Sequence, residues 1–245
     1  MKVSDYTITK NDQIARNIYL MKLSGDTSDF GRPGQFVNIA LAGKYLRRPI
    51  SVCDYTERDF TIIYKVVGEG TRQMSAMTVG QRLNVLTGLG NGYTLTDAGA
   101  PMLVGGGVGV PPLYGLARRL LERQIRPLVL LGFNCADELF FENEFRRLGC
   151  QVIVATADGS AGARGLVTDC ILRGNLKFDY VYACGPEPML RAVNDCTPKT
   201  PGQFSFEERM GCGFGACMGC TCKTKYGSKR ICVDGPVLSK EEIIW

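Results

Sequence analysis

The sequence has no histidine among its 245 residues. Acid–base catalysis by imidazole, Ser-His-Asp hydrolysis and histidine-ligated metals, including a Rieske centre, are therefore excluded from this chain. Chemistry in such a protein is expected to belong to bound cofactors, which the protein orients and tunes. We accordingly assign no catalytic side chain.

Long apolar runs and basic blocks are also missing. No segment approaches the ~18 apolar residues that span a bilayer, and the N-terminal segment MKVSDYTITK lacks the apolar core of a signal peptide. The net charge of +5 is spread without a Lys/Arg block that would indicate a nucleic-acid groove. We therefore expect a cytoplasmic protein that binds neither membrane nor nucleic acid. Its eleven cysteines are then expected to be reduced thiols and metal ligands.

The cysteines are the most informative residues that are present, and five of them lie in the last 34 positions. Three follow a C-x4-C-x2-C pattern among glycines and a fourth lies downstream, which is the plant-type spacing of a [2Fe–2S] cluster. The alternative is a zinc site with four thiolates, but zinc ribbons pair two short knuckles and the downstream cysteine has no close partner. The spacing favours the iron–sulfur cluster and leaves Cys222 as a spare. The assigned ligands are Cys212, Cys217, Cys220 and Cys232.

The pattern of apolar residues changes near residue 98. Before it, short strand-like segments alternate with glycine turns, which predicts a small antiparallel β-barrel and one short helix at Arg72–Met77. After it, strand-like runs alternate with helical stretches, such as the run Leu128–Phe133 and the helix expected near Glu138–Leu148, which predicts a doubly wound parallel α/β sheet. The segment Thr197–Gly202 is a plausible linker into the cysteine-rich tail. The expected domains are a barrel over 1–97, an α/β domain over 98–200 and a small cluster domain over 201–245.

Two turns at the ends of predicted strands have compositions suited to a dinucleotide. The first, Val104–Pro112, is rich in glycine and opens a predicted helix, the context in which backbone N–H groups face a pyrophosphate. It departs from the strict G-x-G-x-x-G pattern, and a plain tight turn is the alternative. The second, Cys184–Pro186, ends the last predicted strand, where ligands of open α/β sheets bind. A buried core cysteine is the alternative there.

The predicted barrel carries a possible phosphate site. An Arg followed closely by a hydroxyl, as in Arg48-Pro-Ile-Ser51, can hold a phosphate through charge-assisted hydrogen bonds. Gly70 and Thr71 open the short predicted helix, whose N–H groups would face a pyrophosphate. Taken alone, Arg48 is equally explained as a solvated surface residue.

In combination these motifs resemble the ferredoxin–NADP reductase superfamily. Within it, the chain resembles the electron-transfer subunits of class B dihydroorotate dehydrogenases, and the resemblance covers essentially the whole chain. The matching segments are Pro33-Gly-Gln-Phe-Val37, Arg48-Pro-Ile-Ser51, Glu207-Glu-Arg-Met-Gly-Cys-Gly-Phe-Gly-Ala-Cys-Met-Gly-Cys220 and Val233-Asp-Gly-Pro236.

The resemblance implies three cofactor sites. It implies that FAD is bound by the predicted barrel, NAD by the predicted α/β domain, and a [2Fe–2S] cluster by the four cysteines assigned above. The residues implied for FAD are Arg48, Pro49, Ile50, Ser51, Ile63, Tyr64, Lys65, Gly70 and Thr71. Those implied for the nicotinamide side are Gly105, Gly106, Gly107, Gly109, Pro111, Cys184, Gly185 and Pro186.

The resemblance also implies a partner and an electron path. Dihydroorotate would be oxidised at FMN in a separate catalytic subunit, in a heterotetramer of two copies of each chain. Electrons would then pass to the cluster, to FAD and finally to NAD⁺, in the pathway that makes pyrimidines. For the nicotinamide, the acidic segment Asn134–Glu138 favours NAD over NADP, because a carboxylate suits a ribose hydroxyl and repels a 2′-phosphate.

Two alternatives remain open at the level of sequence. One keeps the fold but makes the chain the nicotinamide-linked flavin/iron–sulfur reductase subunit of a ferredoxin transhydrogenase or a sulfide-type reductase. The other makes it a cysteine-rich redox or zinc sensor on a reductase fold, since fold does not fix function.

Overall fold

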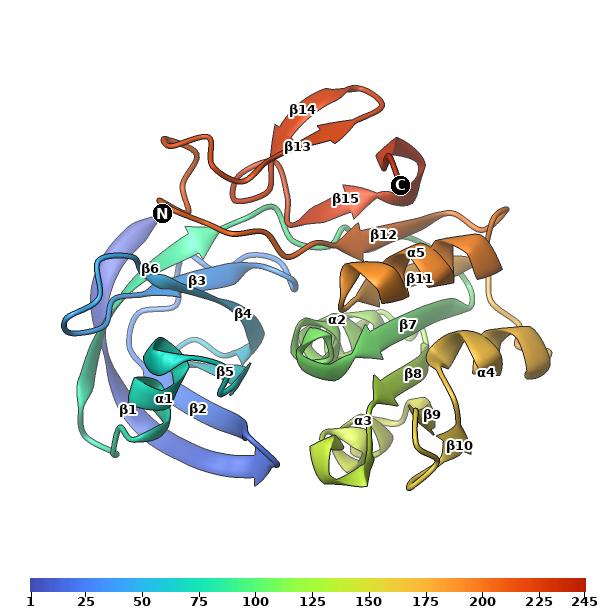
Figure 1. Ribbon diagram of the computed structural model, residues 1–245, viewed down its shortest axis with the longest axis horizontal. Helices are drawn as coiled ribbons and strands as arrows, with labels where there is room; N and C mark the ends of the chain where they lie inside the picture. Colours follow the sequence, from blue (N-terminus) through green and yellow to red (C-terminus); the bar gives the residue numbers. More distant parts are fainter.

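The computed structural model describes residues 1–245 and begins with a closed antiparallel barrel, on the left of Figure 1. Its strands close in the order β1-β2-β5-β4-β3-β6, as expected from the alternating segments of the sequence. Buried aromatic and branched side chains from all six strands fill the interior. The elements are β1 (Lys2–Ala15), β2 (Ile18–Ser24), β3 (Phe36–Ile39), β4 (Arg48–Tyr55), β5 (Asp59–Lys65), α1 (Glu69–Ser75) and β6 (Arg82–Leu89).

A seven-stranded sheet follows, in the order β10-β9-β8-β7-β11-β12-β15, with only β15 antiparallel. Helices cover both faces, so the predicted doubly wound sheet is confirmed. In β7, Leu103 packs on one side of the sheet with α2 and α3, while Met102 and Val104 pack on the other with α4 and α5. The elements are β7 (Pro101–Gly106), η1 (Gly107–Gly109), α2 (Pro111–Glu122), β8 (Leu128–Phe133), η2 (Ala136–Glu138), α3 (Glu142–Leu148), β9 (Gln151–Thr156), β10 (Ala163–Arg164), α4 (Val167–Arg173), β11 (Tyr180–Cys184) and α5 (Glu187–Cys196).

The C-terminal segment runs across the top of both units in Figure 1. Its first strand, β12, pairs in parallel with β11, and β15 then pairs with β12, so part of this segment belongs to the sheet. The cysteine-rich loop and a separate hairpin lie between these two strands. The elements are β12 (Gly202–Ser205), β13 (Thr221–Thr224), β14 (Gly227–Arg230), β15 (Val237–Ser239) and η3 (Lys240–Glu242).

Two side chains near the C-terminus fasten this segment to the sheet unit. Trp245 packs against Phe204 and Phe206, with ring centroids 5.9 Å apart in each pair. The ammonium group of Lys240 is buried and donates to the carbonyl of Thr197 and, at 2.9 Å, to that of Thr200. Thr197 follows the last residue of α5, so the lysine supplies a positive charge at the negative end of that helix.

The barrel and the sheet unit meet along β4 and α2. A side chain at Gly115 would lie 2.8 Å from the carbonyl oxygen of Cys53, so the helix approaches the strand at a glycine. One turn later, Arg118 reaches the carboxylate of Asp54 at 2.8 Å and donates to the carbonyl of Tyr55 at 2.9 Å. None of the helices combines the length and the apolar character needed to cross a membrane.

Candidate functional site

The cysteine-rich loop brings its four assigned ligands together as two pairs. Cys212 and Cys217 each accept a hydrogen bond at sulfur from the other's backbone N–H, at 3.4 and 3.5 Å. Cys220 accepts one from the N–H of Cys232 at 3.4 Å, and the second pair is buried. Cys222 lies on β13, outside both pairs. The loop between the two pairs turns through Met218, which has a φ of 58°.

Backbone N–H groups tune the thiols of these pairs. Burial opposes ionisation of Cys212, but N–H groups of Cys217 and Phe214 donate to its sulfur and together lower its pKa to about 6. Burial and the neighbouring thiol of Cys220 raise the pKa of Cys232 to about 12. Cys212 is therefore biased toward the thiolate, the form that ligates metals. Cys232 would release its proton on binding a metal.

The arrangement in pairs fits a binuclear cluster better than a zinc ion. A [2Fe–2S] cluster with four cysteines takes two thiolates at each iron. A structural zinc site instead gathers four ligands tetrahedrally around one atom. In this structure no three Cys, Asp or Glu side chains converge on one point, whereas two pairs of thiols lie in one loop and its following hairpin. The residues present therefore fit the iron–sulfur group.

The loop is held in place by the hairpin and by the barrel. Arg230 on β14 donates to the carbonyl of Gly215 at 3.1 Å and lies 3.4 Å from the carboxylate of Asp234. On the barrel side, the Asn91 side chain donates to the carbonyls of Asp234 and Val237 at 3.1 and 2.7 Å. The ligand-bearing segment is thus tied internally through Arg230 and, near its C-terminal end, to the barrel side through Asn91.

The two predicted nucleotide turns pack directly against each other at the carboxyl ends of β7 and β11. A Cβ at Gly109 would collide with the carbonyl of Cys184, and one at Gly106 would collide with the sulfur of Met189. Gly107 differs, because a Cβ there meets nothing within 4 Å and its φ is +52°. The backbone at Gly107 is therefore open to a ligand, while the other glycines allow two loops to touch.

Cys184 lies at the end of β11 in a buried position. Burial raises the pKa of its thiol to about 12, so it stays protonated at neutral pH. The neighbouring carbonyl, that of Ala183, accepts a hydrogen bond at 3.0 Å from the hydroxyl of Tyr93, whose ring is fully buried. Tyr93 in turn donates its N–H to the carbonyl of Pro33 in the barrel at 2.7 Å. This chain of contacts fixes the second nucleotide turn relative to the barrel.

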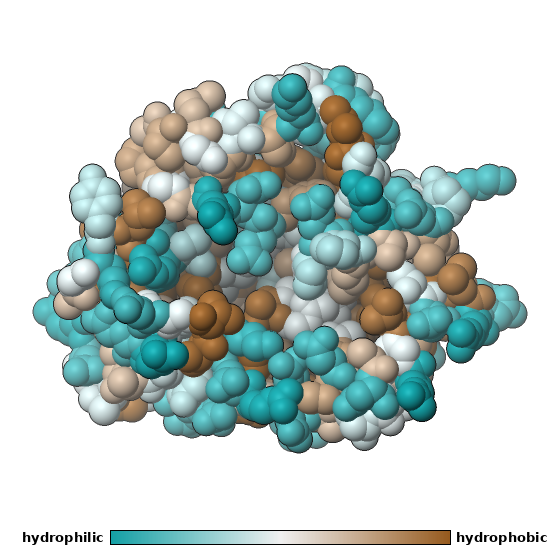
Figure 2. All heavy atoms as spheres, in the orientation of Figure 1, coloured by the Kyte–Doolittle hydropathy of each residue, from teal (hydrophilic) through white to brown (hydrophobic).

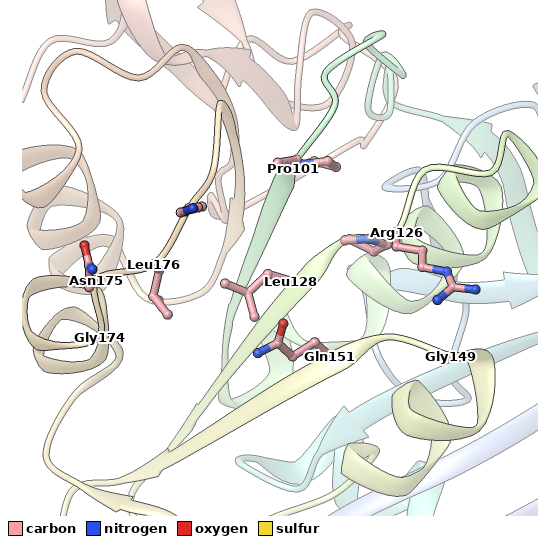
Figure 3. Close-up of a pocket in the computed structure, with 11 residues that line it drawn as sticks. Pro101, Arg126, Leu128, Gly149, Gln151, Gly174, Asn175 and Leu176 are labelled. Carbon is pink, nitrogen blue, oxygen red and sulfur yellow. The ribbon is translucent and has the colours of Figure 1, made fainter.

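A small cavity of about 150 Å³ adjoins this turn and is lined by Gly185, Pro186, Glu207 and Glu208 among others. A larger cavity, of about 530 Å³, lies at the opposite edge of the sheet (Figure 3). The labelled Pro101, Leu128 and Gln151 there mark the amino ends of β7, β8 and β9. Ligands of open α/β sheets bind at the carboxyl ends. The larger cavity is therefore not part of the predicted nucleotide site.

In the barrel, the predicted phosphate residues lie together. The Arg48 guanidinium passes so close to Gly70 that a Cβ on that glycine would collide with it. Arg48 also donates to the carbonyl of Leu46. The hydroxyl of Thr71 accepts from the N–H of Val67 at 3.0 Å, so it caps α1. Pro49, Ile50 and Ser51 continue β4 as half-buried residues.

The stretch on β5 is largely committed to other contacts. Tyr64 is buried, and its hydroxyl donates to Asn11 at 2.9 Å. Its neighbour Ile63 belongs to the buried core. The ammonium group of Lys65 binds the carboxylate of Glu138 at 2.9 Å, across the boundary between barrel and sheet. These contacts leave mainly the backbone of β5 for a cofactor.

Glu138 has different partners from those that the sequence reasoning gave it. Lys65 and Arg16 of the barrel lie 2.9 and 3.7 Å from its carboxylate, and Asn134 donates to it at 2.8 Å. Lys65 lowers the pKa of this carboxyl below its usual value. Asp137 lies 3.6 Å from Arg16. Through these contacts the acidic segment joins the two units, and the expected contact of its carboxylates with a ribose stays a prediction.

Figure 2 shows a hollow on the same face as Figure 1, between the barrel, the sheet unit and the C-terminal segment. The residues that bind these three parts together carry no motif. Tyr93, Asn91 and Asn38 are such residues, and sequence reasoning missed all three. Asn38 is 1% exposed and donates to the carbonyl of Cys212 at 3.3 Å. The burial of a single asparagine in a strand cannot be recognised from one sequence.

Two family models match this chain. The iron–sulfur cluster binding domain of dihydroorotate dehydrogenase B matches residues 207–244. The oxidoreductase NAD-binding domain matches residues 103–195. The first covers all four assigned ligands, and the second covers both nucleotide turns.

Curated relatives match over nearly the full length. The chain is 44% identical over 258 aligned positions to the electron transfer subunit of dihydroorotate dehydrogenase B (NAD(+)) of Fusobacterium nucleatum, with 99% of each chain covered. It is 43% identical over 255 positions to the subunit of the same name from Bacillus pumilus, covering 99% of this chain and 98% of the relative.

Solved structures show the same architecture. One, from a study of flavin-based electron bifurcation by an NADH-dependent reduced ferredoxin-NADP oxidoreductase, superposes with a TM-score of 0.90 at 34% identity, covering 98% of this chain and 90% of the other. A cytochrome P450 reductase from Amycolatopsis superposes with a TM-score of 0.72 at 22% identity, covering 80% and 66%. At that identity the second likeness concerns the fold alone.

Proposed function

Because this chain belongs to the family of electron-transfer subunits of dihydroorotate dehydrogenase B, we propose that it carries electrons between a catalytic dihydroorotate dehydrogenase subunit and NAD⁺. The chain is an oxidoreductase subunit that works with a [2Fe–2S] cluster, FAD and NAD. When bound, FAD supplies the link between the two kinds of carrier, since it exchanges single electrons with a cluster and hydride with a nicotinamide. The process belongs to the biosynthesis of pyrimidines.

The observation that carries this proposal is the pairing of thiols in the cysteine-rich loop. Cys212 with Cys217 would hold one iron, and Cys220 with Cys232 the other. The loop supplies N–H donors to the sulfurs, which stabilise the negative charge of the ligands. The protein's part in the chemistry is to bind and orient, which agrees with its lack of histidine.

For the flavin, we assign the β4 stretch and the start of α1 to the phosphate end. Arg48 supplies a permanent positive charge beside Gly70, where the backbone is free of a side chain. For the nicotinamide nucleotide, the open backbone at Gly107 would face the pyrophosphate. The neutral thiol of Cys184 and the turn Gly185–Pro186 would border the nicotinamide ring without adding charge. The remaining residues of both stretches line the two sites.

We further propose that the partner is an FMN-containing catalytic subunit and that two copies of each chain form a heterotetramer. The family name implies a catalytic partner, and this chain, which has no histidine, offers no imidazole acid or base for pyrimidine oxidation. We place the complex in the cytoplasm, since all eleven cysteines are free thiols in the structure, as in a reducing compartment.

The test is to co-express the chain with an FMN-dependent dihydroorotate dehydrogenase subunit and to assay NAD⁺ reduction by dihydroorotate. Activity is expected only when both chains are present and both flavin and cluster absorb in the visible spectrum. A protein that purifies as a colourless zinc protein would refute the proposal. Size-exclusion chromatography with light scattering tests the proposed stoichiometry.

One observation favours a second candidate function. The structural likeness at 34% identity is to a chain from an NADH-dependent reduced ferredoxin-NADP oxidoreductase. A flavin–cluster protein that is inactive with the dihydroorotate dehydrogenase subunit but reduces a ferredoxin-linked partner with NADH would move the physiology to that class while leaving the cofactor assignments in place.

A further inference from the structure

Asn38 is a buried polar residue at the junction of the barrel and the cysteine-rich loop. It lies in β3, where Val37 and Ile39 point into the barrel core and Phe36 packs against the core cluster that contains Cys220 and Cys232. Side chains two apart on a strand share a face, so Asn38 lies on the same outer face as Phe36. The C-terminal segment covers this face.

The contact between Asn38 and the loop is close. The Asn38 Nδ2 donates to the carbonyl of Cys212 at 3.3 Å. The next residue, Gly213, has a φ of +81°, and a Cβ at that position would collide with the same Nδ2. Only glycine accepts both that conformation and that approach. The loop is thus pressed onto Asn38 at its first cluster ligand.

Asn38 is also the neighbour of the proposed flavin stretch. Across the β3–β4 pair it lies opposite Pro49. A proline has no N–H to donate to the Asn38 carbonyl, and the guanidinium of Arg47 donates to it instead at 3.2 Å. One residue therefore touches the backbone of a cluster ligand through its side chain and the β4 wall through its main chain.

The environment of Asn38 is not the one that stability alone would favour. Its side chain is 1% exposed, and its Oδ1 has no hydrogen-bond partner. A buried acceptor without a partner is costly, because it gives up its hydrogen bonds to water and gains none in the protein. The Nδ2 of the same amide is used, since it donates to the Cys212 carbonyl, and this contact indicates a role in placing the loop.

We infer that Asn38 is a positioning residue, which holds the Cys212 end of the cluster against the flavin-binding wall and so sets the rate of electron exchange between the two cofactors. The inference rests on the proposed function, which supplies the two cofactors. In the exchange one electron leaves the reduced flavin and one ferric ion of the cluster becomes ferrous. No protein bond forms or breaks, and the flavin proton passes to solvent. Because the cluster holds one electron, a second transfer would follow only after the first electron has passed to the catalytic subunit, and two such transfers would then account for both electrons of one hydride.

The rate of electron tunnelling falls exponentially with the distance between the two centres. Without the Nδ2–H···O bond, we expect the loop to occupy positions further from β4 more often. A hydrogen bond of ordinary strength changes the equilibrium constant between two such positions by about fivefold. Reduction of the cluster should therefore slow by up to that factor, while the hydride step at the flavin keeps its rate.

The test is Asn38→Leu in the full chain loaded with both cofactors, mixed with NADH. Flavin bleaching in stopped flow should be unchanged, and cluster reduction followed by freeze-quench electron paramagnetic resonance should be slower, by up to about fivefold. Flavin and iron contents should stay near wild type, and the melting temperature should fall by no more than the loss of one hydrogen bond produces. Cluster reduction at the wild-type rate would overturn the inference. Wild-type protein without flavin and cluster would instead refute the proposed function.

Asn91→Leu is the matched control, because Asn91 also ties the cluster segment to the barrel but contacts Asp234 and Val237 rather than a cluster ligand. It should lower the melting temperature and leave the rate of cluster reduction closer to wild type. Equal slowing in both variants would overturn the assignment of a specific role to Asn38. If Asn38→Leu does not fold, Asn38→Asp removes the same donor at unchanged volume and is judged by the same two rates.

Discussion

At the scale of single residues, the two kinds of cysteine in the C-terminal loop are expected to differ sharply on substitution. Cys217→Ser removes one thiolate from the exposed pair and should abolish the cluster, while flavin content stays near wild type because the flavin stretch lies on β4 and α1. Iron and sulfide analysis with the flavin absorbance checks both statements. Cys222→Ser is the control and should keep the cluster. Loss of flavin in Cys217→Ser with intact folding would contradict the separation of the sites.

The flavin site can be tested at Arg48, whose guanidinium lies against Gly70. Arg48→Ala should weaken flavin retention by roughly tenfold, since charge-assisted hydrogen bonds contribute about 1.5–3 kcal/mol and part is recovered by solvent. Flavin content after gel filtration, or a titration of the apoprotein with FAD, measures the effect. Arg58→Ala, in an exposed turn of the same barrel, is the control. Unchanged retention in Arg48→Ala would show that this residue does not bind the phosphate.

At the residue scale, the [2Fe–2S] cofactor could be predicted from the spacing of the cysteines, whereas contacts between residues far apart in the sequence could not be predicted. The spacing of the cysteines can be recognised in a single sequence, because the four ligands of the cluster must come from one short segment. The acidic segment Asn134–Glu138 was expected to offer a carboxylate to a ribose. Glu138 instead lies against Lys65 on β5 and Arg16 in the turn between β1 and β2, both more than 70 positions away in the sequence. No local pattern encodes such a partner.

At the scale of elements, the contact of β4 with α2 depends on a partly buried ion pair. Burial raises the pKa of the Asp54 carboxyl above its usual value, although the nearby Arg118 guanidinium acts to lower it. Between the unfolded and folded pKa values the folded chain binds more protons, so its free energy of unfolding falls as pH rises through that window. Arg118 limits this loss at neutral pH.

Arg118→Met should therefore destabilise the fold by about 2 kcal/mol near neutral pH, because it leaves the carboxylate of Asp54 partly buried without its cation. The penalty should shrink as pH falls, down to the contribution of the lost hydrogen bond to the Tyr55 carbonyl once the carboxyl is protonated in both states. Urea unfolding at several pH values measures it. Arg119→Met, which removes a more exposed cation over the Tyr55 ring, is the control and should cost less. A penalty for Arg118→Met that is independent of pH would refute this account.

The elements themselves were largely predictable, and their ends were not. The helix expected from Glu138 to Leu148 is divided in the structure, because Phe141 adopts a left-handed conformation with a φ of 67° and α3 begins only at Glu142. The run Leu128–Phe133 was expected as a strand and forms β8 with those bounds, since a continuous apolar run fits a strand covered on both faces.

At the scale of the whole molecule, the C-terminal segment is part of the sheet as well as the carrier of the cluster ligands. Parallel pairing of β12 with β11 joins positions about 20 residues apart and is invisible in the pattern of either strand. The sequence placed a boundary at residue 200, which remains a prediction of where a separable unit begins. Whether the chain can be divided there depends on whether the sheet folds without the pairing of β12 with β11 and of β15 with β12.

Two deletions test whether the C-terminal segment is a separable domain or a necessary part of the sheet. A chain ending at residue 200 loses β12, β15 and the Trp245 contacts, so it exposes the edge of β11 and should be insoluble or unfolded. Excision of residues 209–234, joined by a short glycine linker, keeps both strands, because the N–H of Phe206 bonds the carbonyl of Pro236 at 2.9 Å and the ends therefore lie close together.

The excised chain also loses the packing of Ile231, which is fully buried, and the Asn91 contact to Asp234, so a lower melting temperature is expected. It should nevertheless bind FAD and reduce ferricyanide with NADH, while lacking the cluster. Flavin content, circular dichroism and the ferricyanide assay measure these outcomes. A folded, flavin-loaded chain ending at residue 200 would instead show that the sheet does not need β12. The cluster segment would then be a separable domain with its boundary where the sequence placed it.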